Sequence, residues 1–562
     1  MKKTFILIFI FSPIYFIQAQ VTGPTTNPYF SIHRNGVSTM EAYGDTLWIS
    51  PKLTRNISNQ LEWHIPQNAD SLINNPKGNV FSLELGKDSI LAGLGYTNFD
   101  QPGDPPTGFG YYFSSNGGQS WRYIPPQLDN NPPDELKCKG TEDKGEKSYP
   151  YPPSYRPECD IQVVYGGFVY NRIRFTVDEQ SPPYEVDFKN EVFFSANWGR
   201  SLLRSTDAGM NWEPVLLPPD NVEEMTPEGI YWWNSNYIIT VTEDGDEEEV
   251  GITVNRYDPT NPNTGLNLLA FSVEIDNQNR VWVGTAKGVN ISENALTAPI
   301  DSISWRHISY DKINYTLLAN WITNIRQEPH SDRVWMTNWH EDPPQREGLV
   351  YTADGGESFK QMLVGERIND IGFKDGYVFA PGNNGLFVSD DAGESWTKIP
   401  QIKSPNTFIK SSTVHSAVAT TTNRVWIGTD DGLASIECCS ENQRFDNWQI
   451  TRVNYPLKGG NVHEPDKRNT TTYAYPNPFS SSVYELVRIK FEVKEQGNVR
   501  IRIFDFGMNL VREIENGTFT PGTYEAVWDG YDGKGRKVDN GPYIYIVETA
   551  SRELSGKMMV VD

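Results

Sequence analysis

Two short segments place tryptophan beside polar and charged side chains that could bind a ligand. They are "ANWGRS", which begins at Ala196, and "TNWHEDPPQREG", which begins at Thr337. An indole ring stacks on the apolar face of a pyranose, while carboxylates and amides bind its hydroxyl groups. The candidate ligand-binding residues are Trp198, Arg200, Trp339, His340, Glu341 and Asp342. The alternative is that the rings only pack between repeated units of the fold.

Hydrolysis is the other chemistry to consider. A glycosidase needs two carboxylates roughly 5–10 Å apart across a cleft, and with 72 acidic residues the sequence does not exclude such a pair. Glu341 and Asp342 are adjacent, so on a strand their side chains would diverge and at most one would be catalytic. No Ser-His-Asp order or phosphate-binding loop stands out. The catalytic residues therefore stay unassigned.

A repeated β-hairpin must position these segments. Near-copies of one pattern are "YYFSSNGGQSWRYI", "LLRSTDAGMNWEPV", "LVYTADGGESFKQM" and "LFVSDDAGESWTKI", which begin at Tyr111, Leu202, Leu349 and Leu386. Apolar residues before each turn alternate as in a strand, the Asp or Asn can accept hydrogen bonds from turn amides, and the Gly tolerates a positive φ. Each copy predicts the capped end of a hairpin, with no chemistry of its own.

The pattern resembles the Asp box, S-x-D-x-G-x-x-W, of sialidases, sortilin-type receptors, xyloglucan-cleaving glycosidases and a photosystem II assembly factor. In those families the box closes the turn between the third and fourth strands of a propeller blade. Asn116 replaces Asp in the first copy, and Thr352 and Phe359 replace Ser and Trp in the third. The matching positions are Ser114, Asn116, Gly118, Trp121, Ser205, Asp207, Gly209, Trp212, Thr352, Asp354, Gly356, Phe359, Ser389, Asp391, Gly393 and Trp396.

Other segments repeat the strand–turn–strand pattern but lack the Asp box. "NRVWVGTAKGVNIS" and "NRVWIGTDDGLASI" resemble the repeats of two-component-regulator propellers. The aromatic residues expected to close the blades are Trp63, Trp121, Trp212, Trp305, Phe359, Trp396 and Trp448. They predict a seven-bladed β-propeller over residues 25–455. Two long gaps predict insertions, one of them a β-hairpin turning at "EDGDEEE", which we interpret as a solvated turn and not as a calcium site.

The N-terminus and the charge indicate export. Residues 1–19 read as a signal peptide, with Lys2 and Lys3 before an apolar run and Ala19 at the cleavage site. No later segment approaches a transmembrane length. The net charge of −23 opposes binding to nucleic acids or anionic membranes.

Four cysteines are compatible with that compartment. Cys138 and Cys159 bracket a Pro- and Lys-rich loop, and we predict a disulfide between them. Cys438 and Cys439 are adjacent, and the sequence leaves open a vicinal disulfide or two separate thiols. No Cys/His spacing resembles a zinc site, so neither a metal nor a cofactor is predicted.

A second domain follows a polar linker, residues 456–472. Residues 473–562 alternate as the strands of a small β-sandwich. They resemble the Ig-like domain of flagellar hook-capping proteins and the C-terminal sorting domain of the type IX secretion system. The residues that carry the resemblance are Tyr475, Pro476, Asn477, Pro478, Phe479, Trp528, Asp529, Gly530, Gly535, Gly541, Pro542 and Tyr543. The resemblance implies type IX machinery as a partner, with passage through the periplasm to the cell surface or the medium.

Together these features predict an all-β chain, a seven-bladed propeller followed by an Ig-like sandwich. The expected function is binding or scaffolding of a protein or glycan outside the cell. The alternative is a secreted glycoside hydrolase of sialidase-like or xyloglucanase-like type. The sialidase version is weakened because "RIRF", residues 172–175, lacks the proline of that family's motif and no Tyr–Glu pair is identifiable.

Overall fold

The computed structural model describes residues 32–57, 63–64, 75, 77–130, 161–233, 237–243, 246–252, 259–260, 265–311, 316–340, 343–440, 443–453, 471–484 and 486–562. The expected signal peptide and the Cys138–Cys159 pair lie outside these residues.

Seven antiparallel sheets of four strands follow one another along the chain, and the fourth sheet gains β15(Glu224–Met225) at its outer edge. The strands of the first four are β1(Met40–Tyr43), β2(Thr46–Ile49), β3(Thr54–Ile57), β4(Trp63–His64); β5(Asn79–Leu85), β6(Ile90–Thr97), β7(Pro106–Ser114), β8(Arg122–Ile124); β11(Pro183–Lys189), β12(Val192–Asn197), β13(Ser201–Ser205), β14(Glu213–Val215); and β18(Ala270–Ile275), β19(Val281–Thr285), β20(Gly288–Ser292), β21(Trp305–Ile308). Those of the last three are β22(Trp321–Gln327), β23(Val334–Trp339), β24(Gly348–Thr352), β25(Lys360–Met362); β26(Gly372–Lys374), β27(Tyr377–Gly382), β28(Gly385–Ser389), β29(Thr397–Ile399); and β30(Val414–Thr420), β31(Arg424–Thr429), β32(Gly432–Glu437), β33(Gln449–Thr451).

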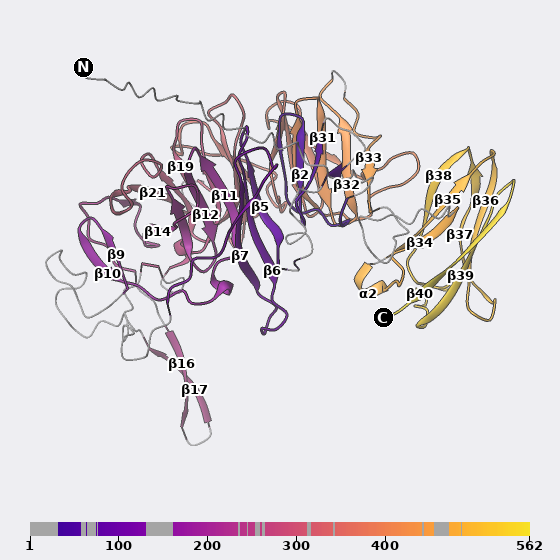
Figure 1. The fold of residues 1–562 in the computed structure, drawn as a ribbon, viewed down its shortest axis with the longest axis horizontal. Helices are drawn as coiled ribbons and strands as arrows, with labels where there is room; N and C mark the ends of the chain where they lie inside the picture. The colour runs from indigo at the N-terminus through magenta and orange to yellow at the C-terminus, as the bar shows by residue number, and fades with distance from the viewer. Residues whose placement is uncertain are drawn as a thin grey trace, which may run out of the picture.

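The sheets form a closed ring, seen at the left of Figure 1. First strands of neighbouring sheets pack together, β1 with β5, β5 with β11, β11 with β18, β18 with β22, and β30 with both β26 and β1. The fifth and sixth sheets meet where Trp335 is buried against Ile371 and Val378. The start of the chain closes the ring, because Val37 N donates to Thr429 O at 2.9 Å. The predicted seven-bladed propeller is confirmed.

Each expected closing aromatic begins the fourth strand of its blade or stands immediately before it. The turn that precedes it is tightly hydrogen-bonded. In the sixth blade Ser389 Oγ donates to Asp391 Oδ1 at 2.7 Å and accepts from Gly393 N at 2.8 Å. Ser395 N donates to Asp391 Oδ1 at 2.8 Å. The Ser395 hydroxyl and amide lower the pKa of Asp391 to about 2, since they bind only its charged form.

The same hydrogen bonds recur in the turns that begin at Ser114, Ser205 and Thr352. Their glycines also form blade contacts. Gly393 has a φ of +89°, and a Cβ placed there would lie 2.6 Å from the Trp335 ring of the preceding blade. These turns thus fasten each blade to its neighbour, which explains why glycine recurs at that position.

A further turn of this kind was not predicted. In the fourth blade Ser292 Oγ donates to Asn294 Oδ1 at 3.0 Å, and Ser304 N donates to the same oxygen at 2.9 Å. The residues between Asn294 and Ser304, with a short 3-10 helix at Ile300–Ser302, stretch the spacing and hide the repeat in the sequence.

Two hairpins extend from the ring (Figure 1). They are β9(Gln162–Tyr165) with β10(Phe168–Asn171), and β16(Tyr237–Glu243) with β17(Asp246–Ile252). The second is the hairpin expected at the acidic stretch, and that prediction is confirmed.

The C-terminal domain is a sandwich of two sheets. One sheet orders β34(Thr472–Tyr475), β35(Val487–Val493) and β38(Gly522–Trp528), and the other orders β37(Leu510–Phe519), β36(Gly497–Phe504), β39(Gly541–Glu548) and β40(Glu553–Val560). A short helix, α2(Ser481–Tyr484), follows β34. The alternating residues Val499, Ile501, Ile503, Tyr545 and Val547 all lie in one core around Trp528. The domain therefore has its own hydrophobic core.

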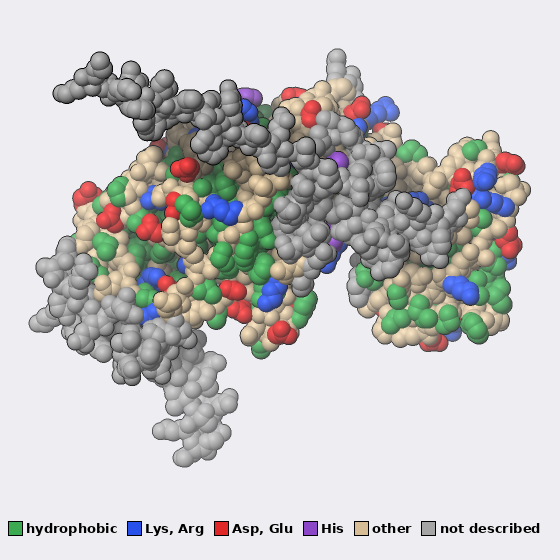
Figure 2. Space-filling view, in the orientation of Figure 1, with side chains coloured by type: hydrophobic (Ala, Val, Ile, Leu, Met, Phe, Trp, Pro, Cys, Tyr) green, Lys and Arg blue, Asp and Glu red, His purple; other side chains and the backbone are tan. Residues whose placement is uncertain are grey.

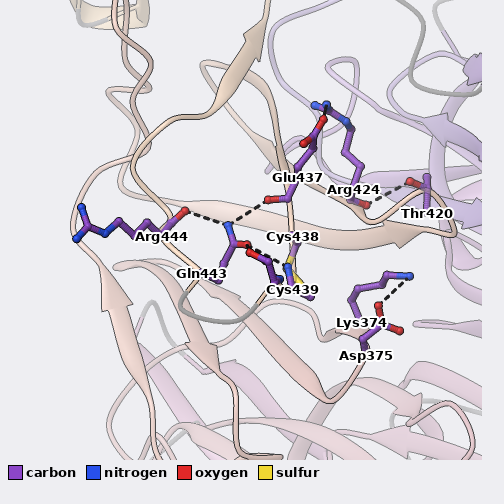
Figure 3. The surroundings of a disulfide bond; sticks show 10 residues. Lys374, Asp375, Thr420, Arg424, Glu437, Cys438, Cys439, Gln443 and Arg444 are labelled. Carbon is purple, nitrogen blue, oxygen red and sulfur yellow. Dashed lines mark hydrogen bonds and ion pairs between the residues drawn. A yellow bond between two sulfur atoms is a disulfide. The ribbon is translucent and has the colours of Figure 1, made fainter.

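Cys438 and Cys439, after β32, form a disulfide between adjacent residues, which settles the pairing left open by the sequence (Figure 3). Cys438 N donates to Asn423 O at 2.8 Å, and Cys439 N donates to the Gln443 side chain at 3.2 Å. The Gln443 amide in turn donates to the Glu437 carbonyl at 3.1 Å. The disulfide thus belongs to the hydrogen-bonded loop between β32 and β33 of the last blade.

Candidate functional site

The two faces of the ring are defined by the strand connections. Turns between second and third strands open on one face, called here the upper face, together with the starts of the first strands. The Ser-x-Asp turns between third and fourth strands lie on the opposite, lower face. Trp198 directly follows β12 and Trp339 ends β23, so both candidate segments lie on the upper face.

Aromatic side chains from three adjacent blades meet there. Trp198 lies 5.4 Å from Phe271 and 6.3 Å from Trp321, measured between ring centroids. Phe271 lies 5.3 Å from Trp321 and 6.3 Å from Tyr184. Trp321 pairs directly with Trp339 across the β22–β23 ladder. We call these five residues the aromatic rim.

The two tryptophans predicted from sequence differ in accessibility. Trp198 is 36% exposed, so part of its ring faces solvent beside Phe271. Trp339 is half-buried, its Nε1 donates to Ile368 O at 2.7 Å, and the Arg367 guanidinium lies 4.6 Å above its ring. The alternative interpretation, a ring wedged between blades, therefore describes Trp339. Trp198 remains available to a ligand.

The other four predicted ligand-binding residues do not share one location. Arg200 is buried, stacks on Phe175 and donates to Gln127 O at 2.6 Å, which removes it from the accessible surface. Burial also lowers its pKa. His340 is half-buried next to Trp339. Glu341 and Asp342 lie outside the described residues.

Near the rim, three polar atoms lack a hydrogen-bond partner among the residues that the structure describes. They are Trp321 Nε1, His340 Nδ1 and Asn324 Oδ1. Buried polar groups are normally paired, so such atoms point to a missing partner such as water or a ligand. Two of the three belong to β22, which starts at the rim. Among the described residues, unpaired polar atoms are therefore buried beneath the aromatic rim and along β22.

Further inside the propeller, the first strands of four blades and the residues just before β26 hold a cluster of acids that sequence reasoning missed. This carboxylate ring consists of Glu41, Glu84, Glu185, Asp187, Glu274 and Asp370. They surround Arg326 of β22. Its guanidinium lies 2.7 Å from Glu41, and 3.6 Å from both Glu185 and Asp370. Phe271 precedes Glu274 by three residues of β18, roughly 10 Å of strand, whereas Tyr184 directly precedes Glu185 on β11, so the carboxylate ring begins immediately below the aromatic rim.

Burial dominates the electrostatics of this ring. It raises the pKa of Glu185 to about 8 and that of Glu41 and Glu274 to about 7, while Arg326 pulls each back toward ionisation. Burial and mutual repulsion raise the pKa of Glu84 and Asp187 as well. One guanidinium cannot neutralise six carboxylates, so the ring holds protons near neutral pH. Glu41 keeps 18% side-chain exposure, and water moderates its shift.

The surface itself is not uniformly acidic. Figure 2 shows Lys and Arg interspersed with Asp and Glu on the visible face of the described residues. Glu185, Asp187 and Asp370 of the carboxylate ring are buried, so part of the acidic excess is internal. Over the described ranges no group of His, Cys, Asp and Glu side chains is arranged to hold a metal ion. Nor does any described helix have the length and apolarity needed to cross a membrane.

The closed ring of seven blades is a β-propeller, and an Ig-like domain follows it at the C-terminus. Residues 485–553 match the family model of the FlgD Ig-like domain. No curated protein is significantly similar to the chain in sequence.

Several solved structures resemble the chain. PorZ, a surface component of the type-IX secretion system of Porphyromonas gingivalis, is 13% identical, with a TM-score of 0.29 over 94% of this chain and 81% of that one. YCF48 bound to a D1 peptide is 12% identical, with a TM-score of 0.39 over 74% and 97%. An ancestral GH74 enzyme is 13% identical, with a TM-score of 0.22 over 95% and 85%. The strand order within the seven sheets defines the propeller independently of these similarities.

Proposed function

We propose that the protein is an exported binding propeller that recognises a glycan or a protein segment at the aromatic rim. The observation that carries this proposal is the exposed Trp198 ring, which stands beside Phe271 and Trp321. The rim therefore offers an exposed stacking face, while Trp321 Nε1, which lacks a partner among the described residues, is buried beneath it. The apolar face of a pyranose ring stacks on an aromatic side chain of this kind.

A glycan panel tests this directly. The full chain is run in native gels that contain neutral, acidic or amino polysaccharides, and retardation reports binding. We expect at least one polysaccharide to retard the chain. Retention by none of them, together with binding to a surface protein lost on substitution of Trp198, would favour the protein segment. Absence of any ligand for the rim would overturn the proposal.

The second candidate is a glycoside hydrolase, and the carboxylate ring is what favours it. Glu185, with a pKa of about 8, would be protonated at neutral pH as a general acid must be. Against this, Glu185 is buried and, like Glu41 and Asp370, faces Arg326 rather than an open cleft. Measuring reducing ends released from the same panel separates the two functions. Steady release, abolished by Glu185→Gln, would establish hydrolysis.

We further propose that the Ig-like domain serves export through type IX machinery to the cell surface or the medium. The support is the sorting-domain resemblance in the sequence and the domain's own core. Fractionating cells that express the full chain or a chain ending before Tyr473 tests it. We expect the shortened chain to stay in the periplasm. Equal surface or medium levels for both would rule out the sorting role.

A further inference from the structure

The Ig-like domain touches the propeller through a buried network of charges. Arg452, just after β33, and Asp431, in the β31–β32 turn, belong to the seventh blade. Arg488 of β35 and Glu525 of β38 belong to the Ig-like domain. Their side chains are 6%, 19%, 3% and 12% exposed in that order. Figure 1 shows the sandwich beside β31, β32 and β33.

Every member of the network has partners in both domains or bridges them. Arg452 Nη1 lies 3.0 Å from Glu525 Oε2, and its Nη2 lies 3.2 Å from Asp431 Oδ2. Arg488 pairs closely with Asp431 across the junction and lies 3.9 Å from Glu525. Thr407 donates to Glu525 Oε2 at 2.6 Å. Two positive and two negative charges therefore balance.

The rest of the junction is loosely packed. A cavity of about 420 Å³ lies next to the network. The propeller contributes Trp63 and Trp426 to its wall, and the Ig-like domain contributes Tyr473 and Lys490. Apolar side chains do not fill this space, and the paired charges cross the junction beside it. A buried charge left without its partner is strongly unfavourable, which makes such a contact specific and easy to break by one substitution.

We propose that this network is a latch that holds the Ig-like domain on the upper face of the seventh blade. Asp431 lies in a second-to-third-strand turn, as Trp198 does, so the domain is fixed on the face that carries the aromatic rim. The rim occupies the third to fifth blades, across the ring. If the rim and the Ig-like domain act as proposed above, the latch sets how the ligand face is oriented relative to the exported domain.

Small-angle X-ray scattering and calorimetry on the full chain test the latch. Arg488→Met leaves Asp431 without its cross-domain cation while Glu525 keeps Arg452, and Glu525→Gln removes the other cross-domain ion pair. For both we expect a larger radius of gyration and a separate, lower unfolding transition for the Ig-like domain. Arg512→Met is the matched control, because the Arg512–Asp529 pair lies within the sandwich and is partly exposed. It should leave the radius of gyration unchanged.

A double variant separates a latch from a merely structural role. Arg488→Met combined with Asp431→Asn removes charges of both signs, and we expect it to recover part of the compact dimension lost in Arg488→Met. An unchanged radius of gyration in Arg488→Met and Glu525→Gln would overturn the proposal, as would an extended wild-type chain. These readouts do not involve glycan binding or export, so their failure is distinguishable from failure of the proposed function.

Discussion

The carboxylate ring makes the stability of the propeller fall as pH rises. The folded-state pKa of Glu185 is about 8, against an ordinary value of 4.5. Between these values the folded chain holds a proton that the unfolded chain has released. Stability from this group is therefore fully present below about pH 4.5 and is lost as pH rises through 8. Between pH 5 and 9 the loss is roughly 4 kcal/mol for Glu185, at about 1.4 kcal/mol per pH unit.

Glu41 and Glu274 act in the same direction, with pKa values of about 7. These groups titrate together around Arg326, so their contributions do not simply add. His307 opposes them below its ordinary value of 6.5, because burial lowers its pKa and favours the neutral ring. The contribution of His307 is the same in the wild type and in a Glu185 variant, so it cancels when their free energies of unfolding are subtracted.

The assay is urea unfolding at pH 5, 7 and 9 of the wild type, Glu185→Gln and Glu437→Gln. Glutamine keeps the shape of Glu185 without the charge, so the variant should match the wild type at pH 5 and exceed it by several kcal/mol at pH 9. Glu437 is an exposed acid of β32, and its variant should follow the wild type. A wild-type midpoint that is flat or rises from pH 5 to 9, or a Glu185→Gln curve parallel to it, would refute the reasoning.

Other predictions concern the turns and the cysteines. Asp207→Ala should lower stability by about 1–2 kcal/mol, since the amides that Asp207 accepts from lose their partner, and Asp391→Ala should act in the same direction; unchanged melting of both variants would remove the capping role. Mass spectrometry of non-reduced peptides should find Cys138 bridged to Cys159, and a free thiol at either position would end that idea.

The propeller was predictable because its signals are local and repeated. In the Ser-x-Asp turns the glycine and the closing aromatic lie a few residues apart. Each blade packs against its neighbours in the same way, so this short pattern recurs along the chain. Ser292 and Asn294 escaped notice only because an insertion separates them from Trp305. The vicinal disulfide could not be decided, since adjacent thiols look the same in sequence whether bonded or free.

The candidate site was only partly predictable because it is assembled from different blades. Trp198 was identified from the polar and charged residues next to it in the sequence. Phe271 and Trp321 look like ordinary strand residues, and they form a surface with Trp198 only because three blades meet in the fold. The carboxylate ring has the same origin. Five blades contribute one or two acids each, such as Glu41 and Glu274, and nothing in the order of the chain links them to Arg326.

Binding of the ligand at the aromatic rim is tested by the affinity of the Trp198→Ala variant. Isothermal titration with the polysaccharide that retards the wild type most is compared between Trp198→Ala and Trp232→Ala. Trp232 is 47% exposed and lies in the segment before β16, outside the blades. We predict at least a tenfold rise in Kd for Trp198→Ala, about 1.4 kcal/mol, with no change for Trp232→Ala. Equal affinity of Trp198→Ala and the wild type would contradict the account.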